Sequence, residues 1–270
     1  MILDLKRRAA VVALTLLLVA ACAPTMPGQD QTFLSKTKGS LISVDSLLEG
    51  GTQVPRAPYE TRAIHDPNGT GKFYMGREIA QVMGPGGIPW LDRPEREDQE
   101  KSSKLLDALE LRDSETVVDL GAGSGYFTFR IAPKVGRAGK VLAVEIQDEM
   151  LQKIRQRAQA LKITNVEAVK GSEADPKLPV KRVDLVLMVD VYHELAYPFE
   201  VMTKIREALK PGGRVYVVEY RKEDPGVLIK EVHKMSVEQV KREMNAAGLA
   251  YVQTLEILPL QHIVIFKNPE

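Results

Sequence analysis

The sequence predicts a doubly wound α/β fold, in which a mostly parallel sheet of seven strands lies between two layers of helices and ends in an antiparallel hairpin. Three observations predict this three-layer αβα sandwich. A glycine-rich turn directly follows the apolar run 116–118. Further apolar runs alternate with helix-compatible segments, as in a parallel sheet covered on both faces. Two β-rich runs then close the chain with only a few residues between them.

The expected elements begin with the segment 101–111, where leucines recur near helical spacing and form an amphipathic helix leading into the first strand. The run 183–189 is apolar on both faces, which is typical of a central strand. Pro133 bends or ends the first helix after the glycine turn. Strands are expected at 116–120, 140–145, 166–170, 183–189 and 214–220, with helices near 125–135, 148–161 and 199–209 between them.

The carboxyl end departs from this alternation. A helix at 236–247 is followed by Gly248, and strands at 249–258 and 261–266 flank Pro259, which predicts an antiparallel hairpin on the parallel sheet. Before the fifth strand, the segment 209–213 (Leu-Lys-Pro-Gly-Gly) combines a proline stop with a glycine turn, so the preceding helix should end there.

The amino terminus has a different composition. Lys6-Arg7-Arg8 precedes the apolar run 9–21, which is short for a membrane span and is typical of a secretory signal. The tetrad 19–22 ends in Cys22, the single cysteine of the chain, and resembles a bacterial lipobox. The sequence therefore predicts a lipoprotein signal peptide at 1–21, acylation of Cys22 and a flexible tether at 22–58. An uncleaved membrane anchor or a misassigned start codon is the alternative.

Residues 59–104 are expected to form an amino-terminal cap, and residues 105–270 the main domain. The cap sets Phe73, Tyr74 and Trp90 among turn residues, so these aromatic side chains should pack on something. The charge run 92–98 is expected to be the solvated start of a helix. The net charge of +1, with both signs interspersed, gives no field for polyanions, so nucleic acid is not an expected partner.

The turn Asp119-Leu-Gly-Ala-Gly-Ser-Gly125 is the strongest functional pattern. Its three alternate glycines remove side chains from a tight strand-to-helix turn, so backbone N–H groups can approach a ligand closely. Glu145 follows 20 residues after Gly125 at the end of the second strand. A carboxylate at that edge can accept both hydroxyls of a ribose. Together these features predict a nucleoside-cofactor site.

From about residue 105 to 266 the chain resembles class I S-adenosylmethionine-dependent methyltransferases. The glycine turn resembles the family's first motif, Glu145 its ribose-binding acid, and the segment 209–213 its turn before strand five. The cap resembles that of an exported bacterial subgroup. The resemblance implies that S-adenosylmethionine is the cofactor and that a small-molecule or envelope-associated acceptor receives the methyl group.

The resemblance also implies roles for individual residues. Asp119 would hold the amino group of the cofactor, Glu145 the ribose, and Asp190 would lie near the sulfonium. His193 is the candidate base, and Glu194 could orient it, or Glu219 and Tyr220 could line the acceptor side. The predicted cofactor residues are Asp119, Gly121, Ala122, Gly123, Gly125, Tyr126, Glu145, Ile146, Ser172, Glu173, Ala174 and Asp190, and the predicted acceptor-pocket residues are Tyr192, Tyr220 and Trp90.

Other interpretations remain open at this level. His193 could equally be a structural or substrate-packing residue. His65, His233 and His262 are expected to be surface or packing residues, and their spacing indicates no metal site.

A noncatalytic nucleoside-binding lipoprotein would keep the same fold. A nicotinamide-dependent oxidoreductase would place a glycine where Tyr126 stands. The export signal predicts a membrane-anchored protein facing the periplasm, where the supply of cofactor is unexplained.

Overall fold

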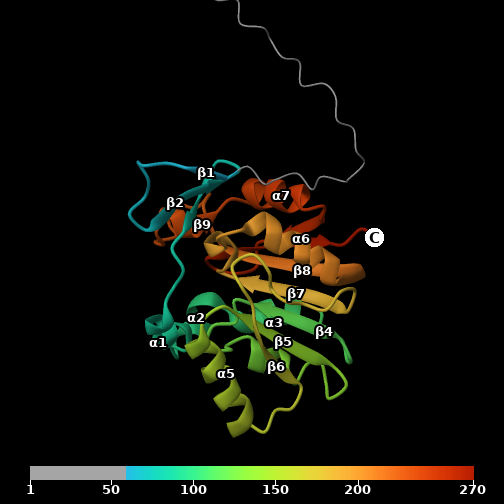
Figure 1. The fold of residues 1–270 in the computed structure, drawn as a ribbon. Coiled ribbons are helices and arrows are strands. Elements are labelled where there is room, and N and C mark those ends of the chain that lie inside the picture. Colours follow the sequence, from blue (N-terminus) through green and yellow to red (C-terminus); the bar gives the residue numbers. More distant parts are fainter. Residues whose placement is uncertain (1–58) are drawn as a thin grey trace, which may run out of the picture. The chain divides into compact units, whose positions relative to one another are not determined.

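A large sheet forms the centre of the fold. The computed structural model describes residues 59–270. The strands are β4 (Thr116–Leu120), β5 (Lys140–Glu145), β6 (Val166–Lys170), β7 (Val183–Val189), β8 (Leu209–Arg221), β9 (Lys234–Met235), β10 (Ala250–Leu255) and β11 (Gln261–Lys267). They are arranged in the order β6-β5-β4-β7-β8-β11-β10, with β9 paired to β8 off this path. Figure 1 labels the part of this order from β6 to β8. Strands β4 to β8 run parallel, and β11 is antiparallel to both β8 and β10.

Helices cover both faces of this sheet. They are α3 (Ser102–Ala108), α4 (Thr128–Ile131), α5 (Asp148–Ala160), α6 (Pro198–Ala208) and α7 (Val237–Ala246). Side chains of α6 and α7 pack with one set of strand residues that includes Val118 and Val186. Side chains of α3 and the segment around α4 pack with the alternate set, which includes Val117 and Leu187. This alternation along each strand confirms the predicted three layers, because successive strand side chains point to opposite faces.

Most predicted elements agree with the observed bounds to within one residue. The helix expected at 101–111 ends at Ala108, and the strand expected at 249–258 ends at Leu255. The helix expected at 125–135 is α-helical only from Thr128 to Ile131. Gly125 has a φ of +83°, which an α-helix does not accept. Strand β8 begins at Leu209 rather than 214, because Leu209 pairs with Val183 before the register shifts.

The predicted cap contains a second, small sheet. Its antiparallel strands are β1 (Tyr59–Thr61), β2 (Gly69–Tyr74) and β3 (Arg77–Ala80), and it leads into η1 (Pro85–Gly87), α1 (Ile88–Leu91) and α2 (Arg96–Glu100). Tyr74 and Ile79 are buried and pack with Phe199 of α6. The aromatic residue Tyr74 therefore does anchor the cap on the main domain.

The expectation that the charge run 92–98 is solvated is wrong for Arg96. Its side chain is 6% exposed and donates to Glu100 Oε2 at 2.8 Å and to the carbonyl of Leu91 at 3.0 Å. Arg96 also lies over the ring of Tyr126. Arg96 thus joins the cap to the glycine-turn region through its contact with Tyr126, while its ion pair with Glu100 lies within α2.

The predicted signal peptide, the acylation site Cys22 and the tether lie outside the described residues. Within residues 59–270, none of the helices has the length and apolar character needed to cross a bilayer.

Candidate active site

The carboxyl ends of β4, β5, β7 and β8 surround one cavity of about 480 Å³. Ligands of doubly wound sheets bind at this edge. At this edge of the sheet, the strands lead into the turns and loops that carry the predicted site residues. Of the predicted site residues, the cavity is lined by Gly121, Gly123, Glu145, Ile146, Ser172, Glu173, Asp190, His193, Glu194, Tyr220 and Trp90.

The remaining predicted residues do not line this cavity. Asp119 lies near the end of β4, Ala122 and Gly125 lie in the turn that follows it, and Ala174 follows Glu173 in the loop after β6. Tyr126 packs under Arg96 and Arg130 and lines a separate hollow. Any contact of these residues with a cofactor stays a prediction.

The glycine turn approaches Glu145 directly. The backbone N–H of Gly123 donates to Glu145 Oε2 at 3.1 Å, and those of Ile146 and Gln147 donate to Oε1 at 2.7 and 3.0 Å. Gly121 has a φ of +67°, and a Cβ there would meet methyl carbons of Val191 at 2.6 Å. The turn thus requires glycine, and its backbone orients the carboxylate at the cavity wall.

Asp119 is buried beneath the same turn. Its Oδ2 accepts a hydrogen bond from Thr128 Oγ1 at 2.5 Å. Burial raises the pKa of Asp119 to about 6, although the bond from Thr128 opposes this change. Asp119 therefore links β4 to the first turn of α4.

Asp190 carries an unpaired oxygen at the cavity. It follows β7 with a φ of +53°, and its Oδ2 accepts from Gln261 Nε2 at 3.1 Å. Its Oδ1 is buried and has no hydrogen-bond partner within the described residues. Burial, together with the charges of Glu100 and Glu219, raises the pKa of Asp190 well above its usual value. Such a group is suited to a cationic ligand, which would pair with the free oxygen.

His193 is held between an acid and a second histidine. Its Nδ1 lies 2.5 Å from Glu219 Oε2, and its Nε2 lies 3.1 Å from His233 Nδ1. Burial opposes protonation of His193, but Glu219 and Glu194 outweigh it, so the pKa of His193 is raised. Burial and the neighbouring His193 lower the pKa of His233 to about 4. Glu219 rather than Glu194 therefore fixes the ring of His193.

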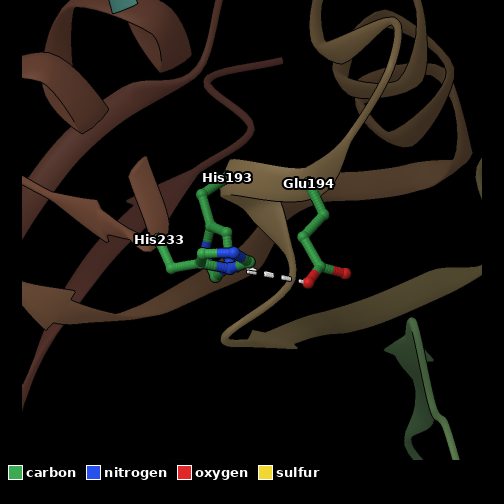
Figure 2. A group of neighbouring side chains, drawn as sticks. All are labelled: His193, Glu194 and His233. Atoms are coloured by element: carbon green, nitrogen blue, oxygen red, sulfur yellow. Dashed lines mark hydrogen bonds and ion pairs between the residues drawn. The ribbon is translucent and has the colours of Figure 1, made fainter. Parts of the chain in front are cut away.

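Glu194 approaches the same two rings from the other side. Its Oε1 lies 3.8 Å from His193 Nε2 and 3.8 Å from His233 Nδ1, and Figure 2 shows the three side chains converging from η2 (Tyr192–Glu194) and η3 (Glu231–His233). Burial raises the pKa of Glu194 to about 7. The sequence indicated no metal-like spacing among the histidines, but folding brings two of them to one carboxylate.

Sequence reasoning missed His233 for a structural reason. The short strand β9 pairs in parallel with the end of β8, so that Lys234 lies opposite Tyr220. His233 directly precedes Lys234, just as Glu219 precedes Tyr220, so the pairing brings His233 close to Glu219. The linear sequence contains no periodic signal for this pairing.

Tyr192 is not at the cavity, which corrects its expected place in the acceptor pocket. Its side chain is fully buried, and its hydroxyl donates to Glu243 Oε2 at 2.8 Å. The same carboxylate pairs with Arg77 of the cap, whose Nε and Nη2 donate to it at 2.8 and 3.0 Å. Arg77 Nη1 also donates to the carbonyl of His193 at 3.1 Å. The cap thus supports the backbone of the candidate site.

Two curated proteins show what the chain is similar to in sequence. The chain is 30% identical over 196 residues to an uncharacterized 37.1 kDa protein in transposon TN4556 of Streptomyces fradiae, covering 67% of this chain and 56% of that protein. It is 29% identical over 118 residues to the ubiquinone/menaquinone biosynthesis C-methyltransferase UbiE of Salmonella arizonae, covering 43% and 47%. The chain spans about half the length of these curated relatives.

Among solved structures, a SAM-dependent methyltransferase from Aquifex aeolicus is 26% identical with a TM-score of 0.65, covering 69% of this chain and 99% of that one. The [4+2]-cyclase SpnF shares the fold at 15% identity and a TM-score of 0.55, covering 62% and 81%. Residues 111–260 match the family described as a methyltransferase domain. This match covers more than half of the chain, and the strand order and the glycine turn agree with it, so the chain belongs to the methyltransferase domain family.

Proposed function

We propose that this protein transfers the methyl group of S-adenosylmethionine to an acceptor bound in the cavity at the carboxyl edge of the sheet. One observation carries the proposal. The glycine turn and Glu145 line the same cavity and are joined by the hydrogen bond from Gly123. A ribose hydroxyl can then approach the carboxylate beside a side-chain-free backbone.

The groups present are suited to this cofactor. A carboxylate offers about four lone-pair directions, and Glu145 uses three of them on backbone N–H groups, which leaves room for a hydroxyl. The free Oδ1 of Asp190 suits a cationic sulfonium or ammonium group, which would favour the ionised carboxylate. A methyl sulfonium is cationic and its thioether product is neutral, so such a pocket binds the reactive form more strongly.

The chemistry needs alignment and the loss of an acceptor proton. S-adenosylmethionine supplies an electrophilic methyl group, so no covalent intermediate with the protein is required. Binding both partners in one cavity aligns the acceptor lone pair with the methyl carbon. We assign the removal of the acceptor proton to His193, which lines the cavity and is oriented by Glu219. Glu194 lies beside it as a second acid.

The acceptor is proposed to be a small or envelope-associated molecule. Tyr220 and the half-exposed Trp90 line the cavity and offer apolar faces to it. UbiE is named for carbon methylation in quinone biosynthesis. An acceptor with an acidic C–H, O–H or N–H group is compatible with a proton acceptor at His193.

Isothermal calorimetry with S-adenosylhomocysteine tests cofactor binding. We expect saturable one-site binding to the parent protein and at least about 100-fold weaker binding to Glu145→Gln, because the ionised acceptor of a ribose hydroxyl is replaced by a neutral amide whose NH₂ group cannot accept the bonds from the backbone. Glu149→Gln, an exposed change in α5, is the matched control and should bind like the parent. Absence of heat with folded parent protein would refute the proposal.

Turnover is measured separately with methyl-labelled S-adenosylmethionine and fractionated cell extract. Transfer of label to an extract component, slowed in His193→Ala with unchanged cofactor affinity, is the expected result. Binding without transfer in any fraction would favour the noncatalytic ligand-binding protein instead.

We also propose that the protein is an exported lipoprotein anchored to a bacterial membrane through acylated Cys22. Support comes from the basic residues 6–8, the apolar run 9–21 and the position of the single cysteine. Labelled palmitate should be incorporated into the parent protein and not into Cys22→Ser. Equal labelling of both proteins would reject the anchor.

A further inference from the structure

We propose that His193, Glu194 and His233 bind one divalent transition-metal cation at the acceptor side of the cavity. All three residues line the cavity, and their ligand atoms lie within 4.8 Å of one another. They come from two separate segments, η2 and η3, that the sheet edge brings together (Figure 2).

The spacing of the ligand atoms fits one ion. His193 Nε2 and His233 Nδ1 are 3.1 Å apart, and Glu194 Oε1 is 3.8 Å from each. The point equidistant from three atoms with these separations lies about 2.1 Å from each of them, which is the usual length of zinc–nitrogen and zinc–oxygen bonds. A small movement of the Glu194 side chain would give a pyramidal arrangement with the remaining positions open.

The first histidine has the support that metal ligands usually have. Glu219 is fully buried, and its Oε2 accepts from His193 Nδ1, while its Oε1 accepts from the backbone N–H of His193 at 3.3 Å. A proton on Nδ1 leaves the lone pair of Nε2 directed at the proposed ion. An acid on the far nitrogen of a ligating histidine is the common outer-shell arrangement in metal proteins.

The donor set and local charge favour a transition-metal cation. Two imidazoles and one carboxylate suit zinc, iron or cobalt, whereas magnesium and calcium prefer oxygen ligands alone. Two basic residues, Arg96 and Lys230, line the cavity, against five acidic ones: Glu100, Glu145, Glu173, Asp190 and Glu194. The acidic residues outnumber the basic ones, so the field favours a cation.

The ion would activate the acceptor, an inference that rests on the proposed methyl transfer. An acceptor hydroxyl bound to the ion releases its proton to solvent more readily. Its oxygen then forms a bond to the methyl carbon while the carbon–sulfur bond breaks, and the sulfur keeps that electron pair as a neutral thioether. In this state His193 acts as a ligand rather than as the proton acceptor, and the preferred acceptor is an oxygen compound such as a phenol or a diol.

The test is zinc binding to the full-length protein, purified without a polyhistidine tag and stripped with a chelator. Competition with a chromophoric chelator should reveal one zinc per chain, in the parent and equally in Cys22→Ser. His233→Ala and Glu194→Gln should each weaken this binding at least about 100-fold, because each removes a ligand. His65→Ala, which removes a histidine outside the group, should bind zinc like the parent. Circular dichroism verifies that each variant is folded.

Two further measurements separate a metal site from a simple hydrogen-bonded histidine pair. Cobalt added to the parent should give visible d–d absorption of a low-coordinate nitrogen and oxygen site, absent in His233→Ala. Glu219→Gln should keep the fold and lower zinc affinity about 10- to 100-fold, the range for outer-shell changes. No saturable zinc site in the parent, or undiminished binding in both His233→Ala and Glu194→Gln, would overturn the proposal. Neither readout requires S-adenosylmethionine, so failure here is distinct from failure of the proposed methyl transfer.

Discussion

At the scale of single residues, the buried carboxyl group of Asp119 couples stability to pH. Its pKa in the folded protein is raised to about 6 by burial, so the folded state favours the neutral acid. This contribution to stability is fully present below about pH 4 and is lost as pH rises through 6. Between pH 4 and pH 6 this group should lower the unfolding free energy of the parent protein by about 3 kcal/mol. The Asp119→Asn variant, which has no carboxyl group to titrate, should not show this decrease. Urea denaturation at a series of pH values measures it, and parallel pH profiles for the two proteins would contradict it.

Gly121 provides a second residue-level prediction. Gly121→Ala should destabilise the fold by more than the roughly 1 kcal/mol of left-handed strain, since its Cβ also meets Val191 at 2.6 Å. Gly212→Ala is the matched control, because Gly212 has a φ of +73° with nothing within 4 Å of its Cβ position. Equal thermal stabilities of the two variants would show that crowding at Gly121 is unimportant.

At the scale of elements, the cap and the main domain are joined by a buried ion pair. Arg77 of β3 binds both oxygens of Glu243 in α7 and also the carbonyl of His193. Removing one member leaves an uncompensated buried charge. Arg77→Met should therefore lower the unfolding free energy by about 3–5 kcal/mol in denaturant titrations.

The double variant Arg77→Met with Glu243→Met should recover part of this loss, because no charge is left unpaired. Recovery should be incomplete, since Tyr192 also donates to Glu243. Arg62→Met is the control. Its pair with Glu60 is exposed, so a change below about 1 kcal/mol is expected. Equal losses of unfolding free energy in Arg77→Met and Arg62→Met would mean that the pair of Arg77 with Glu243 does not hold the cap.

At the scale of the whole molecule, ligand binding should raise thermal stability selectively. S-adenosylhomocysteine at 100 times its dissociation constant stabilises a folded protein by about 2.7 kcal/mol. For a domain of this size, this corresponds to an increase of roughly 5 to 10 °C in the midpoint. NAD at the same concentration should produce no increase, and differential scanning fluorimetry compares the two. A larger shift with NAD would favour the oxidoreductase.

The fold was largely predictable because its signals are local. Apolar runs such as 183–189 predict buried strands by themselves, and all seven long strands occur close to their expected positions. Gly121 and Glu145 were also recognisable, because strands of a parallel sheet all end at the same edge. The order of the strands alone therefore predicts that the glycine turn and Glu145 lie close together.

The group around His193 was only partly predictable because its contacts are not local. Glu219 orients His193 because the strand register places it beside η2. His233 lies next to His193 because β9 pairs with β8. Tyr192 was expected at the acceptor pocket, but its side chain points to Glu243 in the core. Neighbours in a 3₁₀ turn point in different directions, and sequence order does not distinguish them.

The amino-acid sequence by itself determined the doubly wound sheet, the glycine turn with its partner acid, and thereby the family. These features arise from periodicity and from backbone freedom at particular positions, which act over a few residues. The tertiary structure alone decided that Arg77 supports the site from the cap and that two histidines 40 residues apart meet at one carboxylate. Those contacts depend on strand register and on packing between distant segments, and no short stretch of sequence encodes either.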